Sequence, residues 1–284
     1  MIITRFAPSP TGLLHLGHAH AALFADRCAK EENGRFLLRI EDIDPARCKE
    51  EFIAAIIGDL AWLGLSWPEP VRRQSRHMDD YRDALSVLDD LGVLYPCFCT
   101  RKDIMDEISR AGHAPHGPDG VLYPGTCRHL SAAERERRSE TEPFALRLDV
   151  TKATASSGPL SWRDSDKGWQ EAHPEIFGDV VLARKDTPVS YHLAVTVDDH
   201  LQDIGLVTRG EDLFAATHIH CLLQALLGYT APEYRHHALL LDETGRRYAK
   251  RDRALTLRSL REEGKTPEDV RGMIDEKTRK NRRE

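Results

Sequence analysis

The sequence predicts an α/β protein in which a parallel, Rossmann-like sheet is interrupted by an inserted α+β subdomain. Three observations support this prediction. Short apolar strands alternate with amphipathic helices from Ile2 to Asp90, and the same alternation returns from Tyr191 onwards. Between these parts lies a segment rich in Cys, Gly, Pro and His that begins at Cys97. A mildly basic end with one or two helices follows Leu241.

These changes in pattern divide the chain into four stretches. Residues 1–96 are expected to form the first half of the Rossmann-like domain, and residues 97–190 the inserted subdomain. Residues 191–241 then complete the sheet. Residues 242–284 are expected to hold a basic loop and a short helical subdomain.

Composition limits the classes of protein that fit. The 284 residues are 40% hydrophobic, which is enough for one large domain or two modest ones. A net charge of -6 argues against a strongly basic nucleic-acid coat, although the basic end either contacts RNA or is a solvated helical surface. No apolar run reaches the roughly 20 residues of a membrane helix, and the N-terminus lacks a signal-peptide pattern. Six scattered cysteines suit a reducing cytoplasm.

The first strand and helix are joined by a sharp turn that is suited to phosphate binding. Ile2 to Phe6 predicts a short buried strand, and Leu16 to Glu32 predicts a helix. Two prolines and a glycine lie between them, so the turn aims the first N–H groups of the helix at whatever lies above. His15 and His18 add ring donors there, and Gly17 leaves room for a flat ring against the backbone.

Acidic residues follow the second predicted strand, Arg35–Ile40. The carboxyl ends of parallel strands are where open α/β sheets bind ligands, so Glu41 is a candidate to hold an ammonium group. Asp44 is expected to cap the next helix, which is predicted over 46–65. A further helix is predicted over 77–90.

Three cysteines in the inserted segment have a spacing that suits a metal. Cys97 and Cys99 can reach one ion from a tight turn, and Cys127 follows a glycine turn that returns the chain. The alternative without a metal is three buried free thiols. Three thiolates leave one position open, and general chemistry favours a histidine there. The candidates for the fourth ligand are His113, His116, Tyr123 and His129.

The rest of the insertion is expected to contain one charged helix over 131–138 and two strands. The strands are predicted over 144–148 and 178–184, with loops rich in Gly, Ser and Asp between them.

The chain then returns to the sheet with a helix that begins at Tyr191 and ends near Leu201. Asp198-Asp199-His200 could suggest a metal triad, but a helix end facing solvent is the favoured interpretation. A strand over 204–208 leads to Arg209, whose fork of N–H groups can bind a carboxylate. A helix over 215–227 follows, and Leu239 to Leu241 is predicted as the last strand.

Several strings together resemble the class I aminoacyl-tRNA synthetases of the glutamyl and glutaminyl branch. Pro8–Gly12 with His15–His18 resembles the HIGH signature of that class. The strings Leu38–Asp44 and Arg209–Asp212 are also similar to the branch. Arg247–Arg251 stands where the class carries a Lys-Met-Ser-Lys-Ser loop, and of its two lysines only Lys250 is kept.

The resemblance implies a role for each matching residue. It assigns ATP binding and catalysis to His15, His18 and Lys250, with Pro8 and Gly17 also binding ATP. It implies Tyr123 as the fourth zinc ligand beside the three cysteines. The residues that it assigns to glutamate are Arg5, Ala7, Ser9, Glu41, Tyr191 and Arg209. Two arginines and one acid fit glutamate better than glutamine, because a second carboxylate requires a second positive charge.

Few residues follow Lys250, too few for the anticodon-binding region of a glutamyl-tRNA synthetase. With the Cys-x-Cys…Tyr…Cys pattern, this resembles the glutamyl-Q tRNA(Asp) synthetase family. The resemblance implies that ATP with Mg²⁺ activates L-glutamate without tRNA, and that glutamate is then transferred to queuosine in the anticodon of tRNA(Asp). It also implies a structural zinc ion and a cytoplasmic monomer. The alternatives are a catalytic fragment that charges the tRNA 3′ end, a small-molecule adenylyl-transfer ligase and a non-catalytic RNA-binding paralogue.

Overall fold

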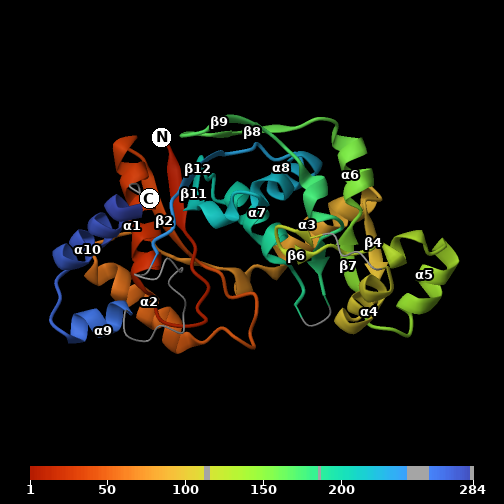
Figure 1. Cartoon of the computed structure of the whole chain (residues 1–284), viewed down its shortest axis with the longest axis horizontal. Coiled ribbons are helices and arrows are strands. Elements are labelled where there is room, and N and C mark those ends of the chain that lie inside the picture. Colours follow the sequence, from red (N-terminus) through yellow and green to blue (C-terminus); the bar gives the residue numbers. More distant parts are fainter. Residues whose placement is uncertain (112–115, 185–186, 242–255, 282–284) are drawn as a thin grey trace.

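The computed structural model describes residues 1–111, 116–184, 187–241 and 256–281. The molecule is elongated, and β1 and α10, the first and last described elements, lie on one side of it (Figure 1). The segment between β4 and β7 lies at the opposite end, with α7 and α8 between the two (Figure 1). The predicted fold class, a Rossmann-like sheet with an inserted subdomain and helices near the carboxyl end, is confirmed.

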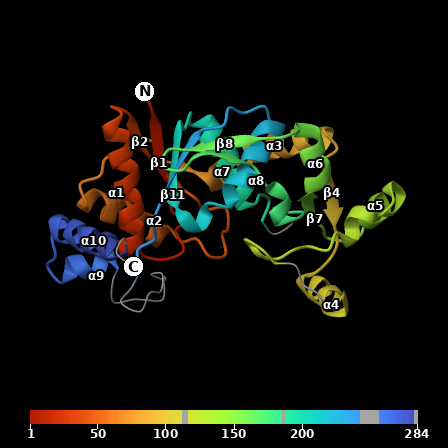
Figure 2. The ribbon, with the colours of Figure 1, turned by 45° about the horizontal axis from the view of Figure 1, so that its top comes forward.

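The centre of the molecule is a twisted parallel sheet. Its strands in the described ranges are β1 (Ile3–Phe6), β2 (Arg35–Ile40), β3 (Arg72–Arg73), β11 (Leu206–Gly210) and β12 (Glu233–His237). β1 lies beside β11, and the Gly205 N–H donates to the Ile3 carbonyl over 3.0 Å (Figure 2). The order across the sheet is therefore β3-β2-β1-β11-β12. The order reverses between β1 and β11, which is where sheets of this kind bind ligands.

Helices near both ends of the chain share one apolar core with β1 and β2. They are α1 (Leu16–Glu31), α2 (Glu50–Trp62), α9 (Leu257–Glu262) and α10 (Pro267–Asn281). Leu16 on α1 and Leu257 on α9 are fully buried in this core. The first predicted helices therefore form as expected, although α2 begins at Glu50 rather than at residue 46. Asp44 does not cap α2, because it accepts the Ala46 N–H within the preceding turn.

A second apolar core lies under the other half of the sheet. Its helices are α3 (Met78–Asp90), α6 (Val150–Ser157), α7 (Tyr191–Leu201) and α8 (Ala216–Leu226). The core continues into an antiparallel sheet of order β10-β7-β4 in the inserted segment. Those strands are β4 (Leu94–Cys97), β7 (Ala145–Leu148) and β10 (Val181–Ala183). The segment also carries α4 (Arg101–Ala111), α5 (Ala132–Ser139) and the short hairpin of β5 (His116–Gly117) and β6 (Gly120–Val121).

One hairpin forms where loops were expected. β8 (Ser161–Asp164) and β9 (Gly168–Glu171) pair antiparallel, and Asp164 pairs in parallel with Tyr234 of β12. The expectation of loops between the two strands of the insertion is therefore wrong in this stretch. Trp162 supplies the reason, because its side chain is buried in a core with Tyr234 and holds β8 against the parallel sheet.

The last parallel strand also differs from the prediction. It is β12 at Glu233–His237, whereas the strand predicted at Leu239–Leu241 does not form. Leu240 instead packs into the core of the terminal helices. β12 has the sequence Glu-Tyr-Arg-His-His, so it lacks the apolar pattern that marks a strand, although Tyr234, His236 and His237 are buried.

Candidate active site

Backbone contacts fix the two histidines of the first turn. His15 is the N-cap of α1, and its Nδ1 accepts the Gly17 N–H over 3.1 Å. The Nδ1 of His18 accepts the His15 backbone N–H over 3.2 Å. The ring centroids are 3.8 Å apart. A nitrogen that accepts cannot carry the proton, so each neutral ring carries it on Nε2 and is a donor there.

The absence of a side chain at Gly17 is required by this arrangement. A Cβ atom built on Gly17 would lie 3.0 Å from Cε1 and 3.2 Å from Nδ1 of His15. Both separations are tighter than ordinary van der Waals contacts, so an alanine would displace the ring. The room that Gly17 leaves is thus occupied on one side by His15, and its use by a ligand ring stays a prediction.

The loops after β1 and β2 are joined beside this turn. The Glu41 N–H donates to the Pro8 carbonyl over 3.1 Å, and the Lys49 N–H donates to the Pro10 carbonyl over 3.1 Å. Pro8 is buried and Ser9 is exposed. Ala7, between Pro8 and β1, is half-buried. The candidate residues for ATP and glutamate in this region therefore belong to one loop cluster at the carboxyl ends of β1 and β2.

Arg5 points from β1 into a buried polar network. Its Nε and Nη2 donate to the two carboxylate oxygens of Asp199 over 2.9 and 3.1 Å. Its Nη1 donates to the Thr208 carbonyl on β11 over 3.1 Å. One hydrogen on each terminal nitrogen is left over from these three bonds, because a guanidinium carries five N–H groups. This pair of hydrogens matches the two oxygens of a carboxylate.

Asp198 and Asp199 correct one prediction. They do not face solvent at a helix end, because their exposed fractions are 0% and 6%. Asp199 also accepts a hydrogen bond from Arg39 over 2.8 Å. Burial alone raises the pKa of a carboxyl, but Arg5 and Arg39 outweigh it and hold the pKa of Asp199 below its ordinary value.

The two aspartates are buried because they face positively charged side chains from the sheet. Arg5, Arg39 and Arg72 come from β1, β2 and β3, and all three reach the two aspartates on α7. Asp198 further accepts hydrogen bonds from Tyr81 and from Gln74. The two carboxylates offset the buried positive charge of these three arginines, and only the folded sheet brings the two sets together.

Glu41 is the acidic candidate of the site. Its side chain is buried, and Arg39 Nη2 donates to its Oε1 over 3.3 Å. Burial raises the pKa of Glu41 to about 7, although Arg39 and Arg5 act in the opposite direction. The carboxyl is therefore close to its titration point near neutral pH, and a bound ammonium group would favour its charged form.

Arg209 ends β11 and is held differently from Arg5. Its Nε donates to His236 Nε2 over 3.2 Å, its Nη1 to His220 Nδ1 over 3.0 Å, and its Nη2 to the Thr217 hydroxyl. All three acceptors are uncharged groups. Within the described ranges, no carboxylate lies in ion-pair distance of this guanidinium.

Tyr191 is the first residue of α7 and is the last of the candidate substrate residues. The hydroxyl of Ser190, the N-cap, accepts the Leu193 N–H and fixes the start of the helix. The ring of Tyr191 lies 5.7 Å from the ring of His220, centroid to centroid. Burial raises the pKa of Tyr191, so its phenol keeps the proton and is a donor at neutral pH. The charged groups that act on it electrostatically are Arg209, Glu41, Arg5 and Asp199.

Lys250, the basic candidate for the leaving phosphates, lies outside the described residues, as do His113, Tyr248 and Ala249. The chain is described again from Thr256, which forms an antiparallel bridge with His15. The Leu257 N–H also donates to the Leu14 carbonyl over 2.8 Å. The start of α9 is therefore hydrogen-bonded to the turn that carries the two histidines.

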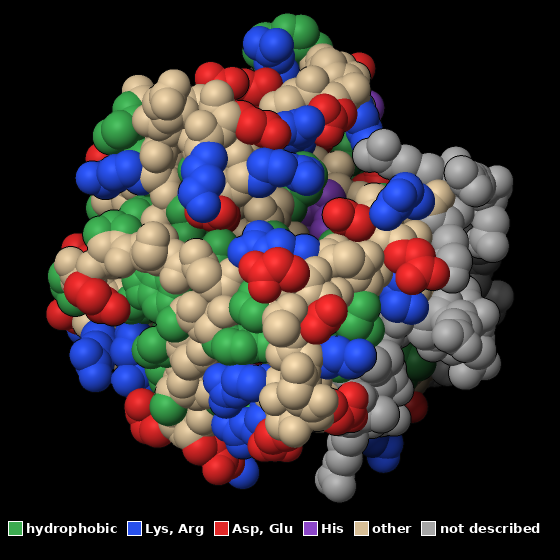
Figure 3. Space-filling model, turned by 90° about the vertical axis from the view of Figure 1, so that its left-hand side faces the viewer, with side chains coloured by type: hydrophobic (Ala, Val, Ile, Leu, Met, Phe, Trp, Pro, Cys, Tyr) green, Lys and Arg blue, Asp and Glu red, His purple; other side chains and the backbone are tan. Residues whose placement is uncertain are grey.

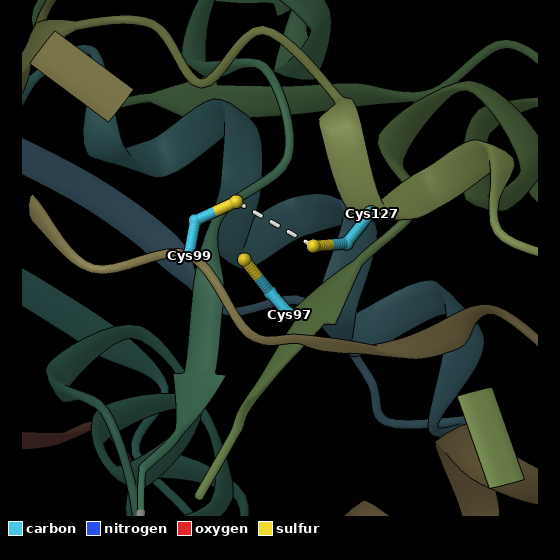
Figure 4. Close-up of side chains that lie close together, drawn as sticks. All are labelled: Cys97, Cys99 and Cys127. Atoms are coloured by element: carbon cyan, nitrogen blue, oxygen red, sulfur yellow. Dashed lines mark hydrogen bonds between the residues drawn. The ribbon is translucent and has the colours of Figure 1, made fainter. Parts of the chain in front are cut away.

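The three candidate cysteines converge on one point in the insertion. Their sulfur atoms lie within 4.8 Å of one another, and Cys99 and Cys127 are 3.5 Å apart (Figure 4). A tetrahedral zinc ion with bonds of about 2.3 Å requires sulfur separations of about 3.8 Å, so the cluster fits such an ion. The Tyr123 hydroxyl lies 3.5 Å from Cys99 Sγ and accepts the Cys127 N–H. His116 and His129 are exposed and do not join this group in the described part of the chain.

A large groove lies apart from the candidate substrate residues. It has a volume of about 1220 Å³ between α1, α10 and the end of β12, and it is not lined by Arg5, Glu41, Tyr191 or Arg209. Side chains of both signs are mixed over the neighbouring face of the molecule (Figure 3). Lys30 pairs with Asp26 on α1 over 2.7 Å. In the described part of this face, basic side chains are therefore interspersed with acidic ones.

The order of the strands, the histidine turn and the buried arginines define a class I synthetase catalytic domain. The family model for the catalytic domain of class I tRNA synthetases for E and Q matches residues 1–276. The glutamyl-Q tRNA(Asp) synthetase of Rhodobacter capsulatus is 50% identical over 96% of this chain and 99% of that protein. The glutamate–tRNA ligase of Aquifex aeolicus is 40% identical over 93% of this chain and 54% of that protein.

Solved structures agree with these similarities. The glutamate–tRNA synthetase of Elizabethkingia anophelis superposes with a TM-score of 0.79 at 28% identity, over 96% of this chain and 61% of that one. The chain belongs to the glutamyl-Q tRNA(Asp) synthetase family of class I synthetases. None of the helices in the described ranges has the length and apolar character needed to span a bilayer.

The sequence pointed to the candidate ligand residues, whose roles stay predictions, and missed most of the residues that contact them. Arg39, Asp164, Thr217, His220 and His236 were not singled out. Arg39 lies inside the string Leu38–Asp44 that had been noted, so this string was a usable signal. The others are separated by long stretches of sequence and offered no such signal.

Proposed function

We propose that this protein uses ATP to activate L-glutamate as glutamyl-adenylate without tRNA, and then transfers glutamate to queuosine in the anticodon of tRNA(Asp). One observation carries the first step: Arg5, Arg209 and Glu41 lie at neighbouring strand ends beside the histidine turn. The second step rests on the name of the Rhodobacter relative, which matches this chain over nearly its full length.

The chemistry of activation needs position and charge rather than a covalent intermediate. The glutamate carboxylate attacks the α-phosphate of ATP in line, and pyrophosphate leaves with the pair of electrons of the broken P–O bond. The Nε2–H groups of His15 and His18 donate to phosphate oxygens, and the dipole of α1 adds to this attraction. ATP is taken as its magnesium complex, which supplies further positive charge on the phosphates.

The amino acid is held by three charges and one hydroxyl. Arg5 and Arg209 bind the carboxylates, Glu41 binds the ammonium group, and Tyr191 donates a hydrogen bond. The loop after β1 lines the site with Ala7, Pro8 and Ser9. The nucleotide lies against the backbone at Gly17. Lys250 stabilises the negative charge that grows on the leaving pyrophosphate.

The insertion has a structural metal in this proposal. Cys97, Cys99, Cys127 and the Tyr123 hydroxyl hold one zinc ion, which joins the end of β4 to the turn at Cys127. Burial raises the pKa of the Cys99 thiol to about 12, so Cys99 would release its proton on binding the ion. No catalytic step requires this ion, because four protein ligands leave no open position.

Two measurements test the function. The first is exchange of labelled pyrophosphate into ATP without tRNA, which is expected with glutamate and absent with glutamine. The second is mass spectrometry of the nucleosides from tRNA incubated with enzyme, ATP and labelled glutamate. Label on the queuosine nucleoside supports the proposal. Label on the 3′-terminal adenosine supports the alternative of ordinary charging, which the similarity to the Aquifex ligase favours.

Two further outcomes would identify other functions. Absence of glutamate-dependent exchange in the unmodified protein would contradict activation and favour a non-catalytic RNA-binding protein. Transfer of glutamate to a small amine or acid in the absence of RNA would favour an adenylyl-transfer ligase of another kind.

A further inference from the structure

We infer that Asp164, on the β8–β9 hairpin, fixes the tautomer of His236 and through it positions Arg209 for a substrate carboxylate. Asp164 is a positioning residue in this inference, since it does not itself contact the ligand. The inference rests on the proposed function only in taking the carboxylate of glutamate as the ligand of Arg209.

The first step is the direction of the hydrogen bonds around Arg209. A guanidinium in a protein always donates and never accepts. His236 Nε2 and His220 Nδ1 must therefore both be acceptors toward Arg209. Each ring then carries its single proton on the other nitrogen, so His236 has its proton on Nδ1 and His220 has its proton on Nε2.

The second step is what receives those protons. His236 Nδ1 lies 2.7 Å from Asp164 Oδ2, and both side chains are fully buried. His220 Nε2 lies 3.1 Å from His192 Nδ1. His236 thus has a carboxylate acceptor in direct contact that holds its proton on Nδ1, whereas the acceptor of His220 is an imidazole nitrogen, and the nearest carboxylate, Asp119, lies beyond it at 3.2 Å from His192 Nε2. The carboxylate makes Asp164 the stronger of the two constraints.

The third step is that Asp164 cannot turn its carboxylate freely. Its Oδ1 accepts the backbone N–H groups of Asp166 and Lys167, each over 3.0 Å, in the turn between β8 and β9. This leaves Oδ2 for His236. The turn of the hairpin therefore fixes which oxygen faces the ring, and the ring in turn faces Arg209 with an acceptor.

The arrangement keeps the charge of Arg209 available. Arg5 is paired directly with Asp199, but Arg209 is separated from Asp164 by an imidazole ring. Burial and Arg209 lower the pKa of His236 to about 4, so the ring stays neutral. Arg209 has three neutral acceptors and one spare hydrogen on each terminal nitrogen. The orientation of the Arg209 guanidinium is thus fixed without a carboxylate that would compete with the substrate.

The variant Asp164→Asn tests this chain of contacts. The two turn N–H groups require an oxygen at the Oδ1 position, so the amide NH₂ of the asparagine faces His236 Nδ1. The ring must then move its proton to Nε2, where it opposes the Nε–H of Arg209. We expect the KM for glutamate in pyrophosphate exchange to rise about ten- to a hundredfold. The KM for ATP and kcat are expected to change far less.

Asp166→Asn is the matched control. It makes the same chemical change in the same turn, but the side chain of Asp166 accepts from Arg235 and does not reach His236. Its KM for glutamate is expected to remain at the value of the unmodified protein. An equal rise in both variants would mean that the turn is disturbed as a whole, which would overturn the inference.

A spectroscopic measurement makes the test independent of activity. Nitrogen-15 NMR of the histidine rings is expected to find His236 protonated on Nδ1 in the unmodified protein and on Nε2 in Asp164→Asn. Protonation on Nε2 in the unmodified protein overturns the inference even if the variant does not fold. Titration calorimetry with glutamate alone measures binding without chemistry. Absence of exchange with intact glutamate binding would therefore contradict only the proposed function.

A double variant tests the order of the contacts from Asp164 through His236 to Arg209. In His236→Gln, the amide oxygen of the glutamine takes the place of Nε2 and accepts from Arg209 without help from Asp164. Adding Asp164→Asn to this background is expected to leave the KM for glutamate unchanged. A further tenfold rise would show that Asp164 acts by a route other than His236, and would overturn the inference.

Discussion

Glu41 is a carboxyl whose charge depends on pH in the range where enzymes work. Its pKa of about 7 means that it is protonated below neutral pH and charged above it. Only the charged form attracts the ammonium group of an amino acid. We therefore expect kcat/KM for glutamate in pyrophosphate exchange to fall as pH is lowered through about 7, and to reach a plateau above it.

Glu41→Gln provides the check on this assignment. The amide cannot ionise, so the variant is expected to have a kcat/KM about a hundredfold lower and no inflection near pH 7. An inflection that persists in Glu41→Gln would assign the titration to another group.

His15 and Lys250 are expected to act on phosphates rather than on the fold. His15→Ala and Lys250→Ala should each lower kcat for pyrophosphate exchange by about a hundred- to a thousandfold, because each removes a donor to charge that grows in the transition state. Their melting temperatures should stay close to that of the unmodified protein.

His129 is exposed and provides a control for the His15 and Lys250 variants. His129→Ala is expected to keep its exchange activity and also its metal content, since this ring does not join the cysteine cluster in the described part of the chain. Full activity in His15→Ala would remove the histidine turn from the mechanism.

At the scale of elements, two glycines on neighbouring helices make a paired experiment. Gly17→Ala places a Cβ 3.0 Å from the His15 ring, whereas a Cβ on Gly58 in α2 meets nothing within 4 Å. We expect Gly17→Ala to raise the KM for ATP about tenfold, because the displaced ring no longer holds its Nε2–H in place. Gly58→Ala should stabilise the protein by up to about 1 kcal/mol.

Thermal unfolding and exchange kinetics on both variants separate these effects. Unchanged KM for ATP in Gly17→Ala would mean that the ring of His15 moves without cost to nucleotide binding.

The elements that could be predicted are those whose pattern is local. α1, α3, α7 and α8 have an apolar face that recurs every three or four residues, and each lies within about two residues of its predicted bounds. β12 could not be predicted, because its buried positions hold tyrosine and histidines whose partners are Trp162, Asp164 and Arg209. Such contacts are set by residues far away in the sequence, and no local pattern reports them.

At the scale of the whole molecule, the site is assembled from every part of the chain. β1 and β2 bring Arg5 and Glu41, β11 and α7 bring Arg209 and Tyr191, and the β8–β9 hairpin brings Asp164. The candidate residues for the ligand could be singled out because each stands in or beside a short recognisable string, and their roles stay predictions. The acids and histidines that hold them could not, since burial turns an apparent surface residue such as Asp198 into a counter-ion only after the sheet has formed.

The cysteine cluster is expected to stabilise the insertion as a unit. Cys99→Ser should lose bound zinc and lower the free energy of unfolding by about 4 kcal/mol or more, because it removes one ligand of the zinc ion proposed between β4 and the Cys127 turn. Elemental analysis and thermal unfolding measure the two quantities. Cys48→Ser, at a half-buried cysteine outside the cluster, should change neither. Full zinc content in Cys99→Ser would show that the cluster is not the metal site.

The bridge between His15 and Thr256 joins the turn before α1 to the start of α9. Leu257 is buried in the same core as Leu14 and Leu16, so α9 cannot detach without exposing the start of α1 to water. We therefore expect the amide hydrogens of these two segments to exchange with solvent together, as one cooperative opening unit. Loosening at the late helices and loss of order in the early turn would then be a single event.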